Sequence, residues 1–195
     1  METKELILKN ALDMFSRSGY DAVSIRDIAK AVNIKESSIY YHFRNKQDIL
    51  DSLVEKYKRH ISELTDMLQA SMQTVHTESS LSWDWLREYY FENYLFDPFC
   101  NQMMRFMMIE QFHNENMRVL YNYFLFELPK DIQTGSFRVL VQLGILNKQQ
   151  AEQIGNDFFA NMTMLTFRYL LNGELTQEKK NSFCEDAFAY ISAMF

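Results

Sequence analysis

The residues with the most distinctive chemistry lie in the segment SIRDIAKAVNIKESSIYYHFRNK, which runs from Ser24 to Lys46. Its second half brings hydroxyl groups, an imidazole and several cations into a short stretch, at Lys35, Ser37, Ser38, Tyr40, Tyr41, His42, Arg44 and Lys46. Cations and hydroxyl groups bind phosphate oxygens, and polar side chains on a helix bind the edges of bases. The segment is therefore predicted to bind double-stranded DNA.

The first part of this segment predicts a short helix that ends in a tight turn. Ser24 can accept from the free N–H groups of the first helical turn, and Asp27 three residues later completes a short capping box. Asn33 falls where the chain must turn, because asparagine is second only to glycine in tolerating the left-handed conformation. One face of this helix is apolar, at Ile25, Ile28, Ala29 and Val32.

A second helix is predicted from Glu36 to Phe43. Only Ile39 and Phe43, four residues apart, can anchor it to a core, so most of its surface is left for a partner. Helix, short turn and helix is the arrangement of helix-turn-helix DNA-binding proteins, in which the second helix enters the major groove. The alternative is an ordinary helical hairpin, which would not require this set of polar side chains.

The order of residues resembles the N-terminal domain of the TetR (tetracycline-repressor-like) family of bacterial regulators. The matching positions are Ser24, Arg26, Asp27, Ile28, Ala29, Ser37, Ile39, Tyr40, His42, Phe43, Asn45 and Lys46. The chain departs from the family pattern at Val32, where Ala is usual, at Asn33, where Gly is usual, and at Lys35. Lys35 replaces a capping Ser or Thr, which removes a helix cap and adds a positive charge.

The resemblance implies roles for individual side chains in a DNA-binding face that also includes Lys35. The residues that would hold phosphates are Ser24, Arg26, Tyr40, His42 and Lys46, and those that would face base edges are Glu36, Ser37 and Tyr41. A carboxylate such as that of Glu36 accepts only from a donor like the amino group of cytosine or adenine. His42 has a second interpretation as a packed side chain, and both stay open at this point.

The rest of the chain predicts an all-α protein. Its 195 residues include only two prolines and five glycines, with 47% hydrophobic and 15% aromatic residues, so helices around a substantial core are expected. No apolar stretch approaches the length of a membrane span, and the first ten residues lack the apolar region of a signal peptide. We expect a cytoplasmic protein with no membrane partner.

The net charge of −6 hides an uneven distribution. Residues 1–60 carry 11 Lys and Arg against 9 Asp and Glu, a balance of +2, and the remaining residues carry 9 against 17, a balance of −8. Affinity for nucleic acid depends on local cations beside phosphates. The acidic remainder therefore limits non-specific adhesion without excluding a specific complex with DNA.

A helix from Glu5 to Ser18, ended by Gly19, completes a three-helix head. We predict that residues 1–46 form a helix-turn-helix DNA-binding domain with a core of Leu6, Ile7, Phe15, Ile28, Ala29, Ile39 and Phe43. A long helix that begins at Lys46 and stays apolar on one face as far as Leu68 leads into residues 47–195. These residues are predicted to be a helical ligand-binding and dimerisation domain.

About nine helices are expected in the whole chain. After a polar loop at 74–82, helices are predicted at 83–96, from Pro98 with Asp97 as its cap, at 116–127, from Pro129 to an end at Gly144, at 148–172 with Gly173 as its C-cap, and at about 177–194. The resemblance implies that the last two long helices form a homodimer interface, since such a helical pair can join its copy as a four-helix bundle.

The methionine and aromatic content of the second domain has two interpretations. The plainer one is close-packed core. The other is a cavity for an apolar or aromatic ligand, which the small-molecule sensing of the TetR family favours. The predicted lining residues are Trp85, Tyr89, Met103, Phe106, Met107, His113, Tyr121, Phe124, Phe158 and Met162.

No metal, cofactor or catalytic site is predicted. Glu110 and His113 have the Glu-x-x-His spacing of di-iron bundles, but that chemistry needs a second such motif, which is absent from the sequence. No phosphate-binding glycine loop, nucleophile elbow or zinc-protease motif is present either, so we do not expect an enzyme. Cys100 and Cys184 are expected to pack as small apolar residues.

Two functions remain open at the level of the sequence. The first is a homodimeric repressor that binds a pseudo-palindromic operator and is released by a small apolar or aromatic effector. The second is a DNA-binding regulator whose C-terminal domain recruits a protein partner and needs no small molecule.

Overall fold

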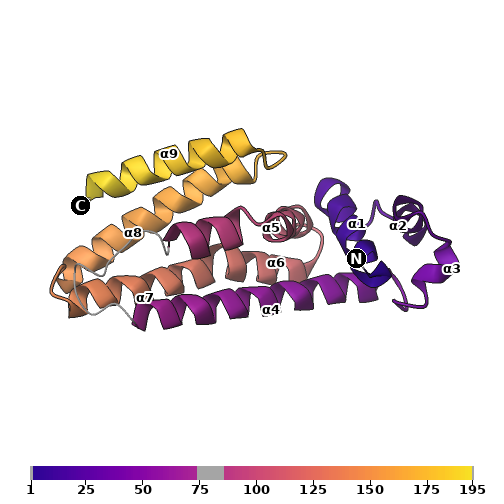
Figure 1. Cartoon of the computed structure of the whole chain (residues 1–195), viewed down its shortest axis with the longest axis horizontal. Coiled ribbons are helices and arrows are strands. Elements are labelled where there is room, and N and C mark those ends of the chain that lie inside the picture. The colour runs from indigo at the N-terminus through magenta and orange to yellow at the C-terminus, as the bar shows by residue number, and fades with distance from the viewer. Residues whose placement is uncertain (1, 74–85, 195) are drawn as a thin grey trace. The chain divides into compact units, whose positions relative to one another are not determined.

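The computed structural model describes residues 2–73 and 86–194, and these residues are helical without any strand (Figure 1). The all-α prediction is confirmed. Within the described ranges the helices are α1 (Thr3–Ser18), α2 (Ile25–Val32), α3 (Glu36–Ile39), α4 (Lys46–Gln73), α5 (Pro98–Glu110), α6 (Glu115–Asn122), α7 (Leu128–Gln142), α8 (Lys148–Leu165) and α9 (Gln177–Met194), with π-helical segments η2 (Leu86–Leu95), η3 (Tyr123–Glu127) and η4 (Thr166–Leu170). The loop predicted at 74–82 and the start of the helix predicted from Trp83 lie outside the described residues.

Among the helices that the structure describes, none combines the length and the apolar content that crossing a membrane requires.

The described residues group into two compact units. The first contains the chain up to Ser62 together with 102–121, and the second contains the rest. The head therefore shares its unit with the first part of α4, most of α5 and nearly all of α6. The division into separate domains at 46 and 47 stays a prediction.

The first unit is built around the buried face of α1. Six of the seven predicted core residues are buried, namely Ile7, Phe15, Ile28, Ala29, Ile39 and Phe43. The seventh, Leu6, was predicted wrongly, because it is only half-buried, whereas Leu8 and Leu12 are buried. The buried positions 7, 8, 11, 12 and 15 form one helical stripe, and residue 6 lies at its edge.

The predicted start and end of α2 are confirmed. The Ser24 hydroxyl accepts from the Asp27 N–H at 3.2 Å, and the Asp27 carboxylate accepts from the Ser24 N–H at 2.9 Å. The Ser24 hydroxyl also donates to the Asp27 carboxylate at 2.5 Å, and this bond, followed by the one from the Ser24 N–H, holds the pKa of Asp27 below its usual value of 3.8. At the other end Asn33 adopts the left-handed conformation, with φ 58° and ψ 43°.

The recognition helix is shorter than predicted, because α3 ends at Ile39 instead of Phe43. The carbonyl oxygen of Ile39 accepts from the N–H groups of both His42 and Phe43, each at 2.9 Å. This double acceptance tightens the chain into a turn over residues 40–42. Phe43 still reaches the core, with 2% of its surface exposed, so the predicted anchoring by Ile39 and Phe43 is confirmed.

The second unit contains π-helical segments that the hydrophobic pattern did not predict. The Phe96 N–H donates to the Phe91 carbonyl at 2.7 Å, and the Leu171 N–H donates to the Thr166 carbonyl at 3.0 Å, each across five residues. The helix expected at 83–96 is thus π-helical over its described part, and the one expected at 148–172 becomes π-helical after Leu165. A 3.6-residue repeat and a slightly wider one differ too little over ten residues to be separated by sequence.

The helix starts predicted at Asp97 and Pro129 in the second unit are confirmed. The Asp97 carboxylate accepts from the Cys100 N–H at 2.8 Å at the start of α5, and Pro129 occupies the first turn of α7. A capping box between Asn147 and Gln150, which was not predicted, begins α8. Gly144 and Gly173, with φ of 74° and 80°, follow α7 and η4. Gly173 was predicted wrongly as a C-cap, because Leu171 occupies that position after η4.

The helices of the second unit are joined by apolar contacts and by buried polar bonds. In Figure 1, α8 and α9 lie side by side and run in opposite directions. The Phe91 ring of η2 meets those of Phe183 and Phe188 in α9, with ring centroids 5.0 and 5.7 Å apart. The Asn101 side chain donates to the Leu170 carbonyl at 2.9 Å, so a carbonyl of η4 is satisfied from α5.

Replacing Ser24 with alanine should lower the free energy of unfolding by about 1 kcal/mol, because the N-cap acceptor of α2 is lost. The difference from wild type should be greatest above pH 3.8 and shrink as the pH falls through the lowered pKa of Asp27, since a protonated carboxyl no longer accepts from Ser24. Urea denaturation over a range of pH measures both effects. Ser18→Ala, at the exposed end of α1, is the matched control, and an equal loss in it would contradict the capping role.

Candidate nucleic-acid interface

The proposed DNA face is made by the start of α2, by α3 and by the turn that follows it. Of the nine predicted residues, eight are exposed, namely Ser24, Arg26, Lys35, Glu36, Ser37, Tyr40, Tyr41 and His42. The two aromatic side chains are unusually open, with 53% of Tyr40 and 88% of Tyr41 exposed. The exposure of His42 removes the alternative in which its imidazole is packed in the core.

Two buried anchors explain this exposure. Ile39 and Phe43 are almost fully buried in the first unit, which turns the remaining side chains of α3 and its turn outward. The Lys4 ammonium lies 5.4 Å from the centre of the Phe43 ring and covers that anchor from α1. The short helix is thus held by two apolar contacts while its polar surface stays accessible.

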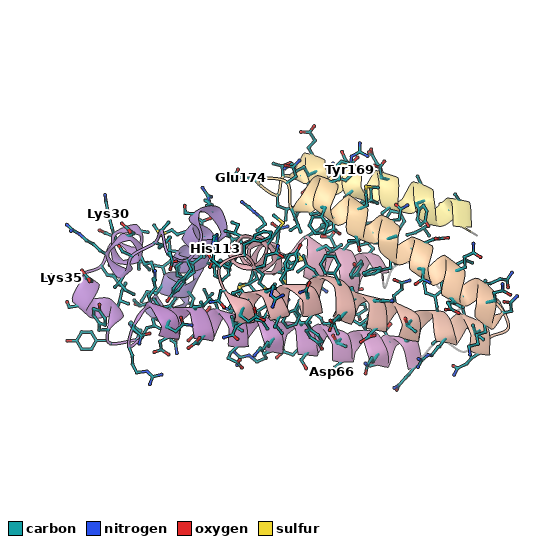
Figure 2. All side chains as sticks on the ribbon, turned by 180° about the vertical axis from the view of Figure 1, so that it is seen from behind. Lys30, Lys35, Asp66, His113, Tyr169 and Glu174 are labelled. Carbon is teal, nitrogen blue, oxygen red and sulfur yellow. The ribbon has the colours of Figure 1, made fainter. Side chains whose placement is uncertain are left out.

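Cations border the face on several sides. Figure 2 shows Lys30 of α2 and Lys35, which directly precedes α3, pointing away from the ribbon, and both side chains are exposed. Lys35 makes no capping bond to α3. The predicted loss of the cap is therefore confirmed.

Arg44 and Asn45 order the start of α4 next to this face. The Asp48 N–H donates to the Asn45 side-chain oxygen at 2.9 Å, which makes Asn45 a helix cap. The Asp48 carboxylate accepts from the backbone N–H of Arg44 at 2.9 Å and from its guanidinium at 3.5 Å. These bonds lower the pKa of Asp48, the backbone bond contributing most.

Lys46, the ninth predicted residue, differs from the others because its ammonium group is already bound within the head. It donates to the carbonyl oxygens of Tyr20 and Val23, both at 2.9 Å, and lies 4.0 Å from the centre of the Tyr20 ring. An ammonium group has three N–H donors, so one is left for a phosphate. Sequence reasoning missed this structural role, since backbone carbonyls more than 20 residues away leave no side-chain pattern.

The predicted ligand-pocket residues are divided between the two units, and Trp85 lies outside the described residues. In the first unit Met103, Phe106, Met107 and Tyr121 are buried, whereas His113 is exposed on the turn after α5. In the second unit Phe124 and Met162 are buried, and Tyr89 and Phe158 are half-buried. The pocket stays a prediction. Phe106 packs on Phe15 with ring centroids 5.6 Å apart, as a plain core residue would.

Tyr90, in the second unit, is not among the ligand-pocket residues that were predicted from the sequence. Its phenol group makes no hydrogen bond to the described residues, although its ring lies 5.9 Å from those of both Phe91 and Tyr94. Burial raises the pKa of Tyr90 well above its ordinary value. The side chain as a whole nevertheless keeps some accessible surface, while its hydroxyl group is desolvated.

Neither the Glu-x-x-His spacing nor the two cysteines provides a reactive group. The Glu110 carboxylate accepts from the Tyr20 N–H at 2.7 Å, while His113 is exposed three residues later. Burial raises the pKa of the Cys100 thiol and, to a smaller degree, that of Cys184. Both thiols are therefore protonated near neutral pH and are poor nucleophiles.

Comparison with known proteins agrees with this geometry. The model of a family described as bacterial regulatory proteins, tetR family, matches residues 7–53. The negative transcriptional regulator IcaR of the biofilm operon icaADBC is 37% identical over 94 residues in Staphylococcus aureus. Residues 7–53 are thus similar to the tetR family of bacterial regulatory proteins. The IcaR of Staphylococcus epidermidis is 48% identical over 52 residues.

These IcaR matches cover parts of both proteins. The Staphylococcus aureus alignment includes 48% of this chain and 46% of IcaR, and the Staphylococcus epidermidis alignment includes 27% and 28%. The chain thus spans less than half the length of the tetR-family relatives it matches. The alignments show similarity to IcaR over these parts of the chain alone.

Solved structures extend the likeness to the whole fold. A TetR-family regulator from Mesorhizobium loti has a TM-score of 0.68 at 15% identity, with 98% of this chain and 94% of that one covered. A transcriptional regulator from Saccharomonospora viridis, crystallised in complex with choline, has a TM-score of 0.65 at 22% identity, with 97% and 95% covered. At these identities the likeness establishes that the chain shares their fold.

The structural role of Lys46 predicts a stability defect that is separate from DNA binding. Lys46→Met should lower the free energy of unfolding by about 1–3 kcal/mol, because two backbone carbonyls lose a charged donor. Urea denaturation without DNA measures the effect. Lys35→Met, which removes an exposed cation from the same face, should change stability by less than about 0.5 kcal/mol. Equal stability of the two variants would show that the Lys46 bonds contribute nothing.

Proposed function

We propose that this protein is a homodimeric transcriptional repressor that acts in the cytoplasm and leaves its operator when a small molecule binds. The observation that carries the proposal is the exposed polar face of α3 and its turn, held by Ile39 and Phe43 and bordered by cations. A structural helical hairpin would gain nothing from leaving Tyr40 and Tyr41 so open. The IcaR relatives are named as negative regulators, which supports repression.

On DNA, the contacts would divide by chemistry. Arg26, Lys35 and the third donor of Lys46 would bind phosphates, with hydroxyl groups from Ser24 and Tyr40 and the imidazole of His42 beside them. Glu36, Ser37 and Tyr41 would reach base edges in the major groove. Since the Glu36 carboxylate can only accept, it would favour a base with an exposed amino group and oppose a phosphate at the same place.

Dimerisation through α8 and α9 is part of the proposal. The exposed stripe of α8 carries Asn156, Ala160 and Met164, and that of α9 carries Ala189 and Ser192. Small residues on both stripes would let the same helices of a second copy approach closely. A two-fold dimer would bring two heads to half-sites of a pseudo-palindrome.

The effector would be a mostly apolar or aromatic molecule with one hydrogen-bond acceptor, bound in the second unit beside η2. The desolvated phenol of Tyr90 supplies a donor that no described residue uses, next to the aromatic rings of Phe91 and Tyr94. π-Helical turns such as η2 are often found at functional sites. The choline bound by the Saccharomonospora viridis protein shows that a protein of this fold can hold a small molecule.

Selection from random DNA should recover a pseudo-palindromic sequence. Fluorescence anisotropy should show tight binding of the full chain to two half-sites and much weaker binding to one. Arg26→Ala should weaken binding to all sequences and make the slope of log affinity against log salt shallower by about 0.9. Glu36→Ala should change which base is preferred at one position of each half-site.

A matched pair of methionine variants tests whether this binding requires the proposed dimer. Met164→Glu on the exposed stripe of α8 should give monomers in sedimentation and lose the advantage of two half-sites. Met67→Glu, at a methionine of α4 that is similarly exposed, should do neither. The absence of any sequence preference in the wild-type protein would refute the proposed function.

If the effector binds beside η2, the variant Tyr90→Phe should lose affinity for the effector specifically. A small aromatic or apolar compound that raises the melting temperature should also release the operator, because it must prefer the state that does not bind DNA. Tyr90→Phe should weaken the binding of that compound by about tenfold while leaving the affinity for the operator unchanged. Tyr169→Phe, whose hydroxyl bonds Asp186 on the surface, is the control. A compound that binds tightly and leaves DNA affinity unaltered would contradict induction.

A further inference from the structure

The turn between α1 and α2 is held by charged side chains from two other helices. This turn, residues Tyr20–Val23, is closed by a bond from the Val23 N–H to the Tyr20 carbonyl at 3.3 Å. It sets the direction in which the chain enters α2, and the Asn33 turn then carries the chain directly into α3. Whatever fixes this turn therefore fixes the exposed face of α3.

On one side the turn is bound by a cation. The Lys46 ammonium at the start of α4 bonds the carbonyls of both Tyr20 and Val23, the first and last residues of the turn, and lies against the Tyr20 ring. The Tyr20 hydroxyl also donates to Gln47 at 3.3 Å. The same lysine is a proposed phosphate contact, so the position of its remaining donor depends on the position of the turn.

On the other side the turn is bound by an anion. Glu110, the last residue of α5, is 6% exposed, and its carboxylate accepts from the Tyr20 N–H at 2.7 Å. A Cβ atom added at Gly19 would lie 3.0 Å from the same carboxylate oxygen, so a side chain there would push against the carboxylate. Burial, Asp21 and Asp51 raise the pKa of the Tyr20 hydroxyl, and the negative charge of Glu110 raises it further.

The end of α5 is itself fixed within the first unit. Gln102 of α5 donates to Asp13 of α1 at 3.2 Å, and Phe106 packs on Phe15. After Glu110 the chain turns towards α6, and the N–H groups of His113 and Asn114 both donate to the Glu110 carbonyl at 2.9 Å. Glu110 thus connects the turn between α5 and α6 to the turn that directs the DNA face.

We propose that Glu110 is a positioning residue for DNA binding, which acts through the Tyr20 peptide on Lys46. The N–H of Tyr20 faces an anion and its carbonyl faces a cation, and hydrogen bonds to charged groups are stronger than neutral ones. Loss of the carboxylate leaves the Tyr20 N–H without its charged acceptor, loosens the turn and moves the Lys46 donor away from its phosphate. This role rests on the proposed function and adds a residue that makes no contact with DNA.

A double-mutant cycle in the full chain tests the proposal, with operator affinity and its salt dependence as readouts. Glu110→Ala is expected to weaken operator binding about tenfold and to make the salt slope shallower by about 0.9, as Lys46→Met does. Because both variants lose the same phosphate contact, Glu110→Ala should cause almost no further loss in the Lys46→Met background. Additive losses would overturn the proposal, since a general weakening of the fold adds to the loss of Lys46.

Glu110→Gln is a milder second variant, which keeps the test valid if Glu110→Ala does not fold. It keeps a side-chain oxygen as acceptor but removes the charge, so it should recover part of the affinity and the full salt slope. Glu115→Ala, which removes an exposed carboxylate paired with Arg118 in the same unit, should leave both readouts at their wild-type values. Wild-type affinity in both Glu110 variants would overturn the proposal.

Hydrogen exchange separates failure of this proposal from failure of the proposed function. The Tyr20 amide should be protected in the wild-type protein and lose protection in Glu110→Ala, whether or not DNA binds. A wild-type protein that selects no DNA sequence would refute the proposed function and this role with it. Selective wild-type binding that none of the Glu110 variants changes would refute this role alone.

Discussion

The DNA face depends on one constraint, namely that a helix of four residues is not stable by itself. A single turn of helix orders several residues for almost no internal hydrogen bonds, so α3 must take its stability from packing. Ile39 and Phe43 provide that packing and are nearly the only side chains available for it. Every other side chain of α3 and its turn is free to face a partner, and their direction follows from how the rest of the first unit holds these two anchors.

That support comes from hydrogen bonds to backbone groups as well as from apolar contacts. The capping box of Ser24 and Asp27 begins α2, and Asn33 in the left-handed conformation ends it. Lys46 and Glu110 bind the turn that precedes α2. Each contact satisfies backbone donors or acceptors that a chain reversal would otherwise leave without partners. The first unit therefore orients a small polar surface with charges drawn from α4 and α5.

The second unit is held together by a different set of contacts. It is joined by aromatic contacts between η2 and α9 and by polar bonds such as that from Asn101 to the Leu170 carbonyl. The wider turns of its π-helical segments shift the side chains after them relative to a regular helix. This unit is richer in half-buried aromatic surface than the first, which suits the adaptable binding of an apolar molecule better than the precise orientation of a polar face.

The sequence by itself determined the all-helical class, the end of α1, the limits of α2, the capping box, the left-handed Asn33, the exposure of the proposed DNA face and the resemblance to the tetR family. These features depend on neighbours within a few residues, which a linear pattern records. Only the tertiary structure decided the early end of α3, the burial of Leu8 in preference to Leu6, the π-helical segments and the contacts of Lys46 and Glu110 with the Tyr20 turn. These depend on residues up to 90 positions apart and on backbone groups that every residue carries alike. No pattern of side-chain types can record such contacts, because the chain meets those partners only after it has folded.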